Sequence, residues 1–182
     1  LAAMVRYLGW RLSALVSPGP AVIPFVNDTL LVAEPTTPEV CELRLFTLRD
    51  FEAMAFVAHV LRPDDYFVDV GASIGSYAIL AAAASGACVT AFEPAPARAT
   101  LLRRNVMLNE LQMLVDTREC ALAEVQGQRD FVVDDDFSVT ARASGLADEI
   151  FPVSVTRLDD ARLAGRPVLA KIDVAGDERG VL

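Results

Sequence analysis

Short apolar runs and longer helical stretches alternate through the middle of the chain. Tyr66 to Val70 is an apolar run typical of a buried strand, and Ala87 to Phe92 predicts a second strand. Ser76 to Ser85 and Ala97 to Leu108 predict helices, the second preceded by Pro96, which fits a first helical turn. Alternating strands and helices form parallel pairs joined by right-handed crossovers. We therefore predict an α/β fold with a doubly wound, mostly parallel, Rossmann-like sheet.

Weaker patterns flank this region on both sides. Before it, the sequence predicts short strands near Ala21 to Phe25 and Leu30 to Ala33, and a helix from about Leu48 to Leu61 that ends before a proline. The first residues, Leu1 to Val16, suit an amphipathic helix better than a signal peptide, because two arginines interrupt the apolar stretch. After it, we expect further strands at Met113–Cys120, Arg129–Val133, Phe137–Ala141, Phe151–Thr156 and Val168–Val174.

These elements divide the chain into two parts. Residues 1–62 would form an N-terminal helix and short strands packed on the core, and residues 63–182 the main α/β domain. The chain begins without an initiator methionine and ends at Leu182 in what resembles the first turn of a helix. We therefore expect a fragment whose main domain is truncated at its C-terminus.

One apolar stretch is long enough to resemble a membrane span. The 22 residues from Gly71 to Phe92 carry no charge, and about 20 apolar residues can cross a bilayer. Gly71, Gly75 and Gly86 interrupt this stretch where a strand, a helix and a second strand would need turns. A helix buried against a sheet has little need of charge. We therefore predict buried α/β structure and no membrane span.

The composition limits the kinds of partner. With 182 residues, of which 53% are hydrophobic and 23% charged, the chain can bury the core of one soluble globular domain. Its net charge of -9 argues against electrostatic binding to nucleic acid or to an anionic membrane, since both need a cationic surface. We expect no nucleic-acid partner.

Cysteine, histidine and clustered acids do not indicate a metal site. Cys41, Cys88 and Cys120 lack Cys-x-x-Cys spacing and are typical of reduced core residues in a cytoplasmic protein. His59 is the only histidine, which excludes a His-rich zinc site. The three acids Asp134 to Asp136 would suit a hard cation, but a solvated turn between two strands is the better interpretation, because consecutive strand residues face opposite ways. We predict no metal.

The candidate ligand site lies where the first two parallel strands end. In a doubly wound sheet, ligands bind at the carboxyl ends of the strands beside the switch point, where Asp69 and Gly71 fall. The next strand ends in Glu93, 22 positions after Gly71, near the spacing at which an acid reaches a ribose hydroxyl. Asp69 could instead cap the loop, and Glu93 the following helix. Their joint placement favours a ligand that resembles a nucleoside.

The sign of the charge indicates which nucleoside. A dinucleotide site brings the backbone N–H groups of G-x-G-x-x-G to a pyrophosphate. Here the spacing is Gly71-x-x-x-Gly75 with Asp69 beside it, so two negative groups would meet. S-adenosylmethionine carries an ammonium and a sulfonium and no phosphate. An acid beside the turn would attract it, while the glycines allow the backbone to come close.

Three ordered motifs resemble the FkbM family of S-adenosylmethionine-dependent methyltransferases. Asp69-x-Gly-Ala-x-x-Gly75 is similar to its first motif, and Phe92-Glu93-Pro94 followed by a helix ending in Asn105-x-x-x-Asn109 is similar to its second. Leu158-Asp-Asp160 and Lys171-Ile-Asp-Val-Ala-Gly-Asp-Glu178 resemble a third block. The similarity covers roughly Pro63 to Leu182 and implies the class I methyltransferase type of sheet, with S-adenosyl-L-methionine as cofactor.

Two positions depart from the family pattern. Ser73 stands where the family usually has Asn, a mild change because both side chains can form hydrogen bonds within a turn. Ala175 stands where the family usually has Glu on the acceptor side of the pocket. The resemblance therefore implies that this departure affects acceptor choice or activity, even where cofactor binding is kept.

The resemblance implies a methyl transfer by in-line displacement, with a hydroxyl of a small molecule or sugar as the acceptor. A carboxylate can remove the hydroxyl proton, and Asp173 is our first choice because it ends a predicted strand at the same crevice. Asp173 could instead bond to the next helix N-terminus. Glu178 and Asp159 are weaker candidates. Lys171 could pair with one of these acids, or it could be an ordinary lysine beside a strand.

The remaining cofactor contacts and alternatives also follow from the resemblance. Ala72 and Ser73 belong to the first motif, and the segment Cys120-Ala121-Leu122 lies where adenine is usually packed, although small apolar residues are equally expected in a core. One alternative is a cofactor-binding homologue with impaired catalysis, suggested by Ala175. Another is a nicotinamide-dependent oxidoreductase with an irregular glycine loop. The acceptor and the oligomeric state are not predicted.

Overall fold

The computed structural model of the chain describes residues 19–33, 43, 47–133, 139–140, 149–174 and 178–182. Several sequence expectations lie outside these residues: the helix at Leu1–Val16, the acidic turn at Asp134–Asp136, the surroundings of Cys41 and those of Ala175.

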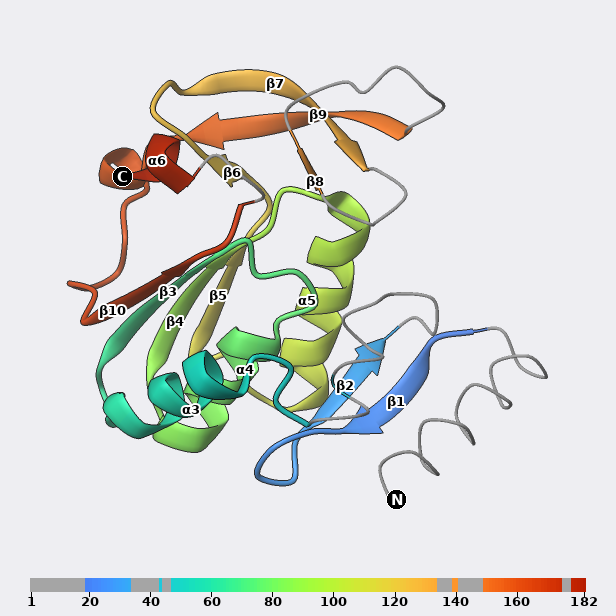
Figure 1. The fold of residues 1–182 in the computed structure, drawn as a ribbon, viewed down its shortest axis with the longest axis vertical. Helices are drawn as coiled ribbons and strands as arrows, with labels where there is room; N and C mark the ends of the chain where they lie inside the picture. Colours follow the sequence, from blue (N-terminus) through green and yellow to red (C-terminus); the bar gives the residue numbers. More distant parts are fainter. Residues whose placement is uncertain (1–18, 34–42, 44–46, 134–138, 141–148, 175–177) are drawn as a thin grey trace.

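A parallel sheet forms the centre of the molecule (Figure 1). Its strands are β3 (Tyr66–Val70), β4 (Cys88–Phe92), β5 (Val115–Arg118) and β10 (Leu169–Ile172), in the order β10-β3-β4-β5. The chain moves from β3 outward to β5 and then returns to the other side of β3, so the switch point lies between β3 and β10. The predicted α/β fold and parallel sheet are confirmed.

Three helices cover one face of this sheet. They are α3 (Phe51–Val60), α4 (Ser76–Ser85) and α5 (Pro96–Leu108), and their apolar residues share one buried cluster with Phe67, Val89 and Ala91 of the sheet. Helix α4 is buried along most of its length, which explains its lack of charge. Residues 71–92 thus form a turn, a helix and a strand, as predicted. In the described residues no helix is both long and apolar enough to cross a bilayer.

The opposite face is covered by shorter elements. The 3-10 helix η1 (Leu158–Asp160) and α6 (Glu178–Val181) contribute to a second buried cluster with Val68, Val70 and Phe92. The two faces therefore have separate apolar cores, one for each set of alternating strand residues.

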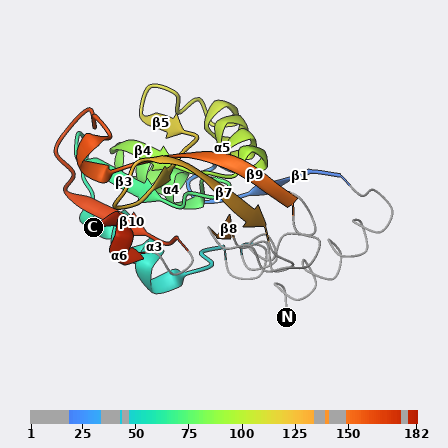
Figure 2. The same ribbon diagram turned by 90° about the horizontal axis from the view of Figure 1, so that it is seen from above.

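The strands between β5 and β10 form a separate sheet, which the sequence analysis did not foresee. Strands β6 (Ala121–Leu122), β9 (Glu149–Thr156), β7 (Gly127–Val133) and β8 (Val139–Thr140) pair in the order β6-β9-β7-β8. β7 is antiparallel to both of its neighbours. β6, at the edge of this sheet, is parallel to β9. In Figures 1 and 2 this sheet lies across the carboxyl ends of the parallel strands.

The N-terminal strands form a hairpin beside α5. β1 (Ala21–Pro24) and β2 (Leu30–Ala33) are antiparallel, and Asn27 and Asp28 between them have positive φ angles of 47° and 62°. Two central residues with positive φ are typical of tight hairpin turns. Ile23 and Leu31 are buried in the same cluster as α4 and α5. The hairpin therefore packs on the core.

Candidate functional site

The candidate site is built around the segment Gly71–Gly75, here called the glycine loop, which joins β3 to α4 at the switch point. The loop is held by the end of the neighbouring strand β4. The N–H groups of Gly71 and Ala72 both donate to the carbonyl oxygen of Phe92, at 3.0 and 2.9 Å. The N–H of Ser73 donates to Oε2 of Glu93 at 2.8 Å. The first three loop residues are thus fixed by the two residues that end β4.

Glu93 is buried and joins two segments of backbone. Its Oε2 accepts the bond from Ser73, and its Oε1 accepts the N–H of Ala95 at 2.9 Å, just before α5 begins. Glu93 thus binds the backbone before α5, as considered above, and it also binds the glycine loop.

Both loop glycines are required by close contacts within the protein. Gly71 has a φ of 75°, and a Cβ there would overlap the backbone carbonyl oxygen of Asp173. Gly75 has a φ of 93°, and a Cβ there would lie 2.5 Å from Cδ1 of Leu102 in α5. The loop can therefore lie against the end of β10 and against α5 only because both positions lack a side chain. Ser73 also has a positive φ, 52°, which fits a position where the family usually has Asn.

Asp69 points toward the helix-covered face of the sheet, where Lys171 meets it. The two residues are register partners on β3 and β10, and the Nζ of Lys171 lies 3.3 Å from Oδ1 of Asp69. Asp69 is fully buried, whereas the Lys171 side chain is 15% exposed. The Lys171 ammonium also donates to the carbonyl oxygen of Gly71 at 2.7 Å and lies 5.3 Å from the ring centre of Tyr77. Lys171 is thus a partner of Asp69 and of the loop, not an ordinary lysine beside a strand.

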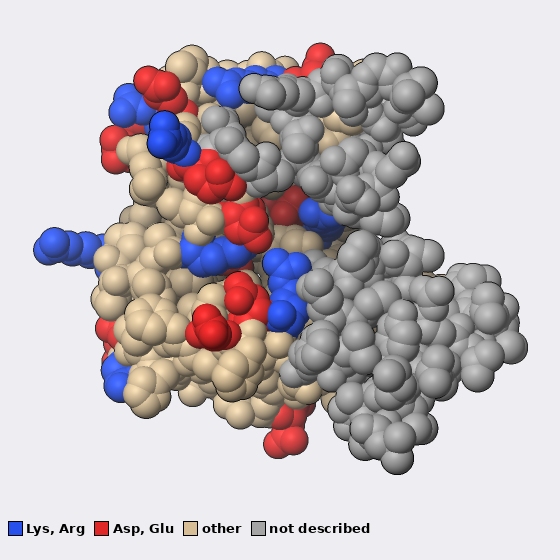
Figure 3. Space-filling view, viewed as in Figure 1, with Lys and Arg blue, Asp and Glu red and all other residues tan. Residues whose placement is uncertain are grey.

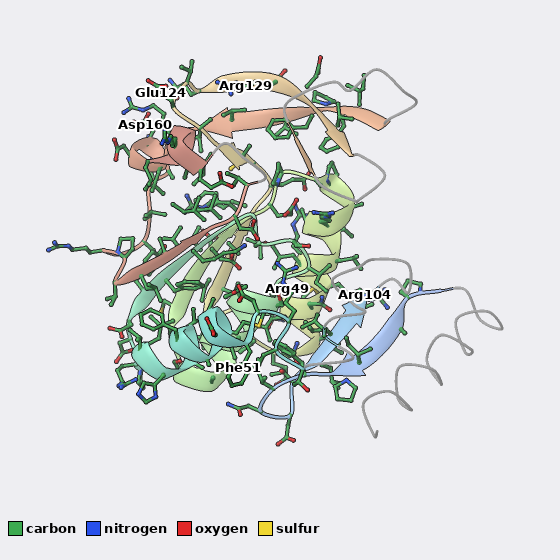
Figure 4. All side chains as sticks on the ribbon, viewed as in Figure 1. Arg49, Phe51, Arg104, Glu124, Arg129 and Asp160 are labelled. Carbon is green, nitrogen blue, oxygen red and sulfur yellow. The ribbon has the colours of Figure 1, made fainter. Side chains whose placement is uncertain are left out.

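Asp173 follows β10 and brings a carboxylate to the edge of this cluster. Its Oδ2 lies 3.6 Å from Nη2 of Arg49 and 3.8 Å from Nζ of Lys171, and its side chain is 58% exposed. The sequence analysis did not include Arg49, which precedes α3 and is labelled in Figure 4. Figure 3 shows acidic and basic side chains next to one another across the middle of this face. The exposed carboxylate therefore lies between two cations at the switch point.

Tyr77 links this cluster to α3. Its hydroxyl donates to Oδ2 of Asp50 at 2.7 Å, and its side chain is buried in the first turn of α4. Burial raises the pKa of Tyr77 well above its usual value, and the hydrogen bond to Asp50 raises it further. Tyr77 therefore stays protonated at neutral pH.

Other predicted site residues lie away from the glycine loop or in different surroundings. Asp159 in η1 is exposed and pairs with Arg157 at 3.3 Å. In Figure 4 its neighbour Asp160 lies with Glu124 and Arg129 at the second sheet, apart from Arg49. Glu178 begins α6 and is exposed.

The segment proposed to pack adenine divides between two clusters. Cys120 and Leu122 pack with Phe92 in the core of the second face, whereas Ala121 is buried between β6 and β9. Burial raises the pKa of the Cys120 thiol, although Arg118 nearby acts in the opposite direction. Cys120 and Leu122 thus pack with Phe92 at the end of β4, whereas Ala121 packs with Val153 and Val155 of β9 within the second sheet.

A comparison with protein families identifies the family of the chain. The model of the methyltransferase FkbM domain matches residues 69–182, more than half of the chain. The chain belongs to the FkbM methyltransferase family. The matched residues include the glycine loop, Glu93, Lys171 and Asp173. The resemblance found in the motifs is confirmed.

Solved structures share parts of this fold at low identity. A protein of Pyrococcus horikoshii described as a transferase is 19% identical, with a TM-score of 0.49 over 64% of this chain and 48% of its own. TYW2 of P. horikoshii, in complex with MeSAdo, is 19% identical, with a TM-score of 0.48 over 64% of this chain and 48% of its own. An S-adenosylmethionine-dependent methyltransferase of Thiobacillus denitrificans, in complex with S-adenosyl-L-homocysteine, is 16% identical, with a TM-score of 0.35 over 37% of this chain and 28% of its own. This chain thus spans about half the length of the first two. No curated protein matches its sequence.

The sequence analysis missed contacts that join distant segments. Arg49 and the side chain of Asn105 were not named as parts of the site, and Lys171 was left without an assigned partner. Asn105 lies in one of the family motifs of the sequence, but the hydrogen bond from its Nδ2 to the carbonyl oxygen of Ile74 in the glycine loop, at 2.9 Å, could not be read from that motif. A positive charge two residues before Asp173, on the strand next to Asp69, could have indicated the pair.

Proposed function

We propose that this FkbM domain binds S-adenosyl-L-methionine at the glycine loop and transfers its methyl group to a hydroxyl oxygen of a small molecule or sugar. The observation that carries the proposal is the arrangement at the switch point. A glycine loop without the dinucleotide spacing, a carboxylate that ends the next strand and an exposed carboxylate after β10 lie together there.

The residues present fit this cofactor. Glu93 lies at the end of β4, where its carboxylate would accept hydrogen bonds from ribose hydroxyls in addition to those from Ser73 and Ala95. Cys120 and Leu122 offer an apolar surface beside Phe92 for adenine. The loop and the Asp69–Lys171 pair would position the methionine part. S-adenosylmethionine, when bound, supplies an electrophilic methyl group.

Asp173 is the proposed general base. Its carboxylate is exposed enough to reach an acceptor hydroxyl, and its Oδ2 forms ion pairs with both Arg49 and Lys171. Oriented in this way, it can accept the hydroxyl proton while the protein aligns the acceptor oxygen. Asp159 and Glu178 remain weaker candidates for this role, the former because it pairs with Arg157.

The kind of acceptor follows from charge. A net charge of -9 repels a polyanion, so we propose a neutral or cationic hydroxylated acceptor and no nucleic acid. Cys88 and Cys120 are free thiols, which supports a reducing, cytoplasmic location.

The test is a calorimetric titration of the folded chain with S-adenosyl-L-homocysteine and, separately, with NAD. We expect saturable binding of S-adenosyl-L-homocysteine alone. Glu93→Gln should weaken this binding at least about tenfold, because an amide accepts fewer hydrogen bonds than a carboxylate and replaces one oxygen by a donor. Asp159→Asn is the control, since Asp159 is exposed and lies apart from the loop. Preferential binding of NAD would favour the oxidoreductase, and equal affinities of both variants would contradict the assignment of Glu93.

A further inference from the structure

Two asparagines on α5 attach the N-terminal hairpin to the FkbM domain. The N–H of Val32 donates to Oδ1 of Asn105 at 2.6 Å, and Nδ2 of Asn105 donates to the Val32 carbonyl at 3.1 Å. The N–H of Leu30 donates to Oδ1 of Asn109 at 2.8 Å, and Nδ2 of Asn109 donates to the Leu30 carbonyl at 2.7 Å. Each amide side chain therefore pairs with one strand residue as a neighbouring strand would.

The spacing of these pairs follows from the geometry of helices and strands. Residues four apart on a helix are separated by about 6 Å along its axis. Residues two apart on a strand are separated by about 6.6 Å, so Asn105 and Asn109 match Val32 and Leu30. The opposite edge of β2 pairs with β1. The helix thus covers the second edge of β2.

Asn105 makes one contact that Asn109 does not. Its Nδ2 also donates to the carbonyl oxygen of Ile74, inside the glycine loop, at 2.9 Å. Asn105 is fully buried, and both hydrogens of its amide are used, one by the hairpin and one by the loop. The second bond of Asn109 goes to the carbonyl of Asn105 within α5. A single side chain therefore joins β2 to the loop.

We infer that Asn105 is a positioning residue that fixes the glycine loop at Ile74 and makes the loop's position depend on the docking of β2. Gly71, Ala72 and Ser73 are held by Phe92, Glu93 and Lys171, and the N–H of Gly75 donates to the carbonyl oxygen of Ala72 within the loop. Loss of the hairpin pairing frees Asn105 to turn, and the loop then loses its bond on the α5 side. The part of this inference that concerns cofactor affinity rests on the proposed function, whereas the part that concerns loop order does not.

The first test compares Asn105→Ala with Asn109→Ala by hydrogen exchange of residues 71–79. Both variants lose a pair of bonds to β2, so both should speed exchange at Leu30 to Val32. Only Asn105→Ala loses the bond to Ile74, and it alone should speed exchange in the glycine loop, by about tenfold or more. Equal exchange of the loop in the two variants would overturn the inference. This readout needs no ligand.

The second test uses the unmodified chain, so that it does not depend on whether a variant folds. Coupling is reciprocal, so a ligand at the loop must also stabilise the docked hairpin. S-adenosyl-L-homocysteine should slow exchange of the Val32 amide, and Asn105→Ala should weaken its binding about tenfold while Asn109→Ala changes it less than about threefold. Binding without any change at Val32 would overturn the coupling. If the unmodified chain binds no S-adenosyl-L-homocysteine, the proposed function fails while the loop-exchange comparison still decides the inference.

Discussion

A methyl group added at Gly71 would overlap the Asp173 carbonyl oxygen, whereas one added at Gly86 would have no neighbour closer than 3.7 Å. Both residues have similar backbone angles, with φ of 75° and 70°. The pair therefore separates the strain of a left-handed conformation from the effect of a collision between two segments of backbone.

We expect Gly71→Ala to lose more stability than Gly86→Ala and to lose cofactor binding. The strain common to both variants is about 1–2 kcal/mol, which is the whole effect expected at Gly86. At Gly71 the loop must also move away from β10, which should weaken S-adenosyl-L-homocysteine binding at least about tenfold. Urea unfolding and calorimetry provide the two measurements. Equal losses of stability and affinity at both positions would refute this account of Gly71.

The ion pair between Asp69 and Lys171 leads to a second prediction. Removing one partner leaves the other charge buried, so Asp69→Asn and Lys171→Met should each cost about 3 kcal/mol of unfolding free energy. The double variant should cost clearly less than the sum, because neither charge remains. A double-mutant cycle by urea unfolding measures the coupling. Asp173→Asn is the control and should cost less than about 1 kcal/mol, since Asp173 is exposed. Additive single effects would show that the pair is not coupled.

At the scale of elements, α3 and α4 are joined by the hydrogen bond from Tyr77 to Asp50. The bond crosses from the residue before α3 to the first turn of α4, close to Lys171. Because the folded protein raises the pKa of Tyr77, the strength of this link depends on pH.

The free energy of unfolding is expected to decrease as the pH rises through the range in which tyrosine titrates. The folded state holds the Tyr77 proton more tightly than the unfolded state, whose tyrosines titrate near about pH 10. The stabilisation is complete below that pH and is lost as the pH rises toward the higher folded value. Urea unfolding between about pH 8 and pH 11 should therefore show a steeper loss of stability for the unmodified chain than for Tyr77→Phe. Identical slopes would contradict the shift.

The two four-stranded sheets contribute different parts of the molecule around the candidate site. The parallel sheet supplies the loop and the carboxylates, while the second sheet lies across its carboxyl ends (Figure 1). Segments added to a common fold beside its active site often determine which substrate an enzyme accepts. Acceptor choice is therefore expected to depend on β6 to β9 more than on the parallel sheet.

For the whole molecule, the departure at Ala175 leads to a prediction about activity. The family usually has Glu at this position, on the acceptor side, where a carboxylate can bind or deprotonate a hydroxyl. We expect Ala175→Glu to raise transfer of a labelled methyl group to a panel of hydroxylated acceptors by at least about tenfold. Affinity for S-adenosyl-L-homocysteine should stay within about twofold. Turnover by the unmodified chain that Ala175→Glu does not increase would argue against an impaired homologue.

The order and type of the main elements were predictable because their causes are local. Continuous apolar strands, a charge-free helix and a proline at the start of α5 each follow from a short stretch of sequence. Strand ends shifted by one or more residues, as in β5 and β10, because end residues are decided by pairing partners. The separate second sheet was missed, since the pattern of a strand does not state which strand it joins.

The sequence by itself determined the parallel α/β fold, the position of the glycine loop, the placement of Glu93 at a strand end and membership of the FkbM family. Only the tertiary structure decided that Lys171 faces Asp69, that Arg49 reaches Asp173 and that Asn105 joins β2 to the loop. The first group depends on residues that are neighbours in the chain. The second depends on strand register and helix docking, which are set by the packing of the whole core and bring together side chains that no local pattern relates.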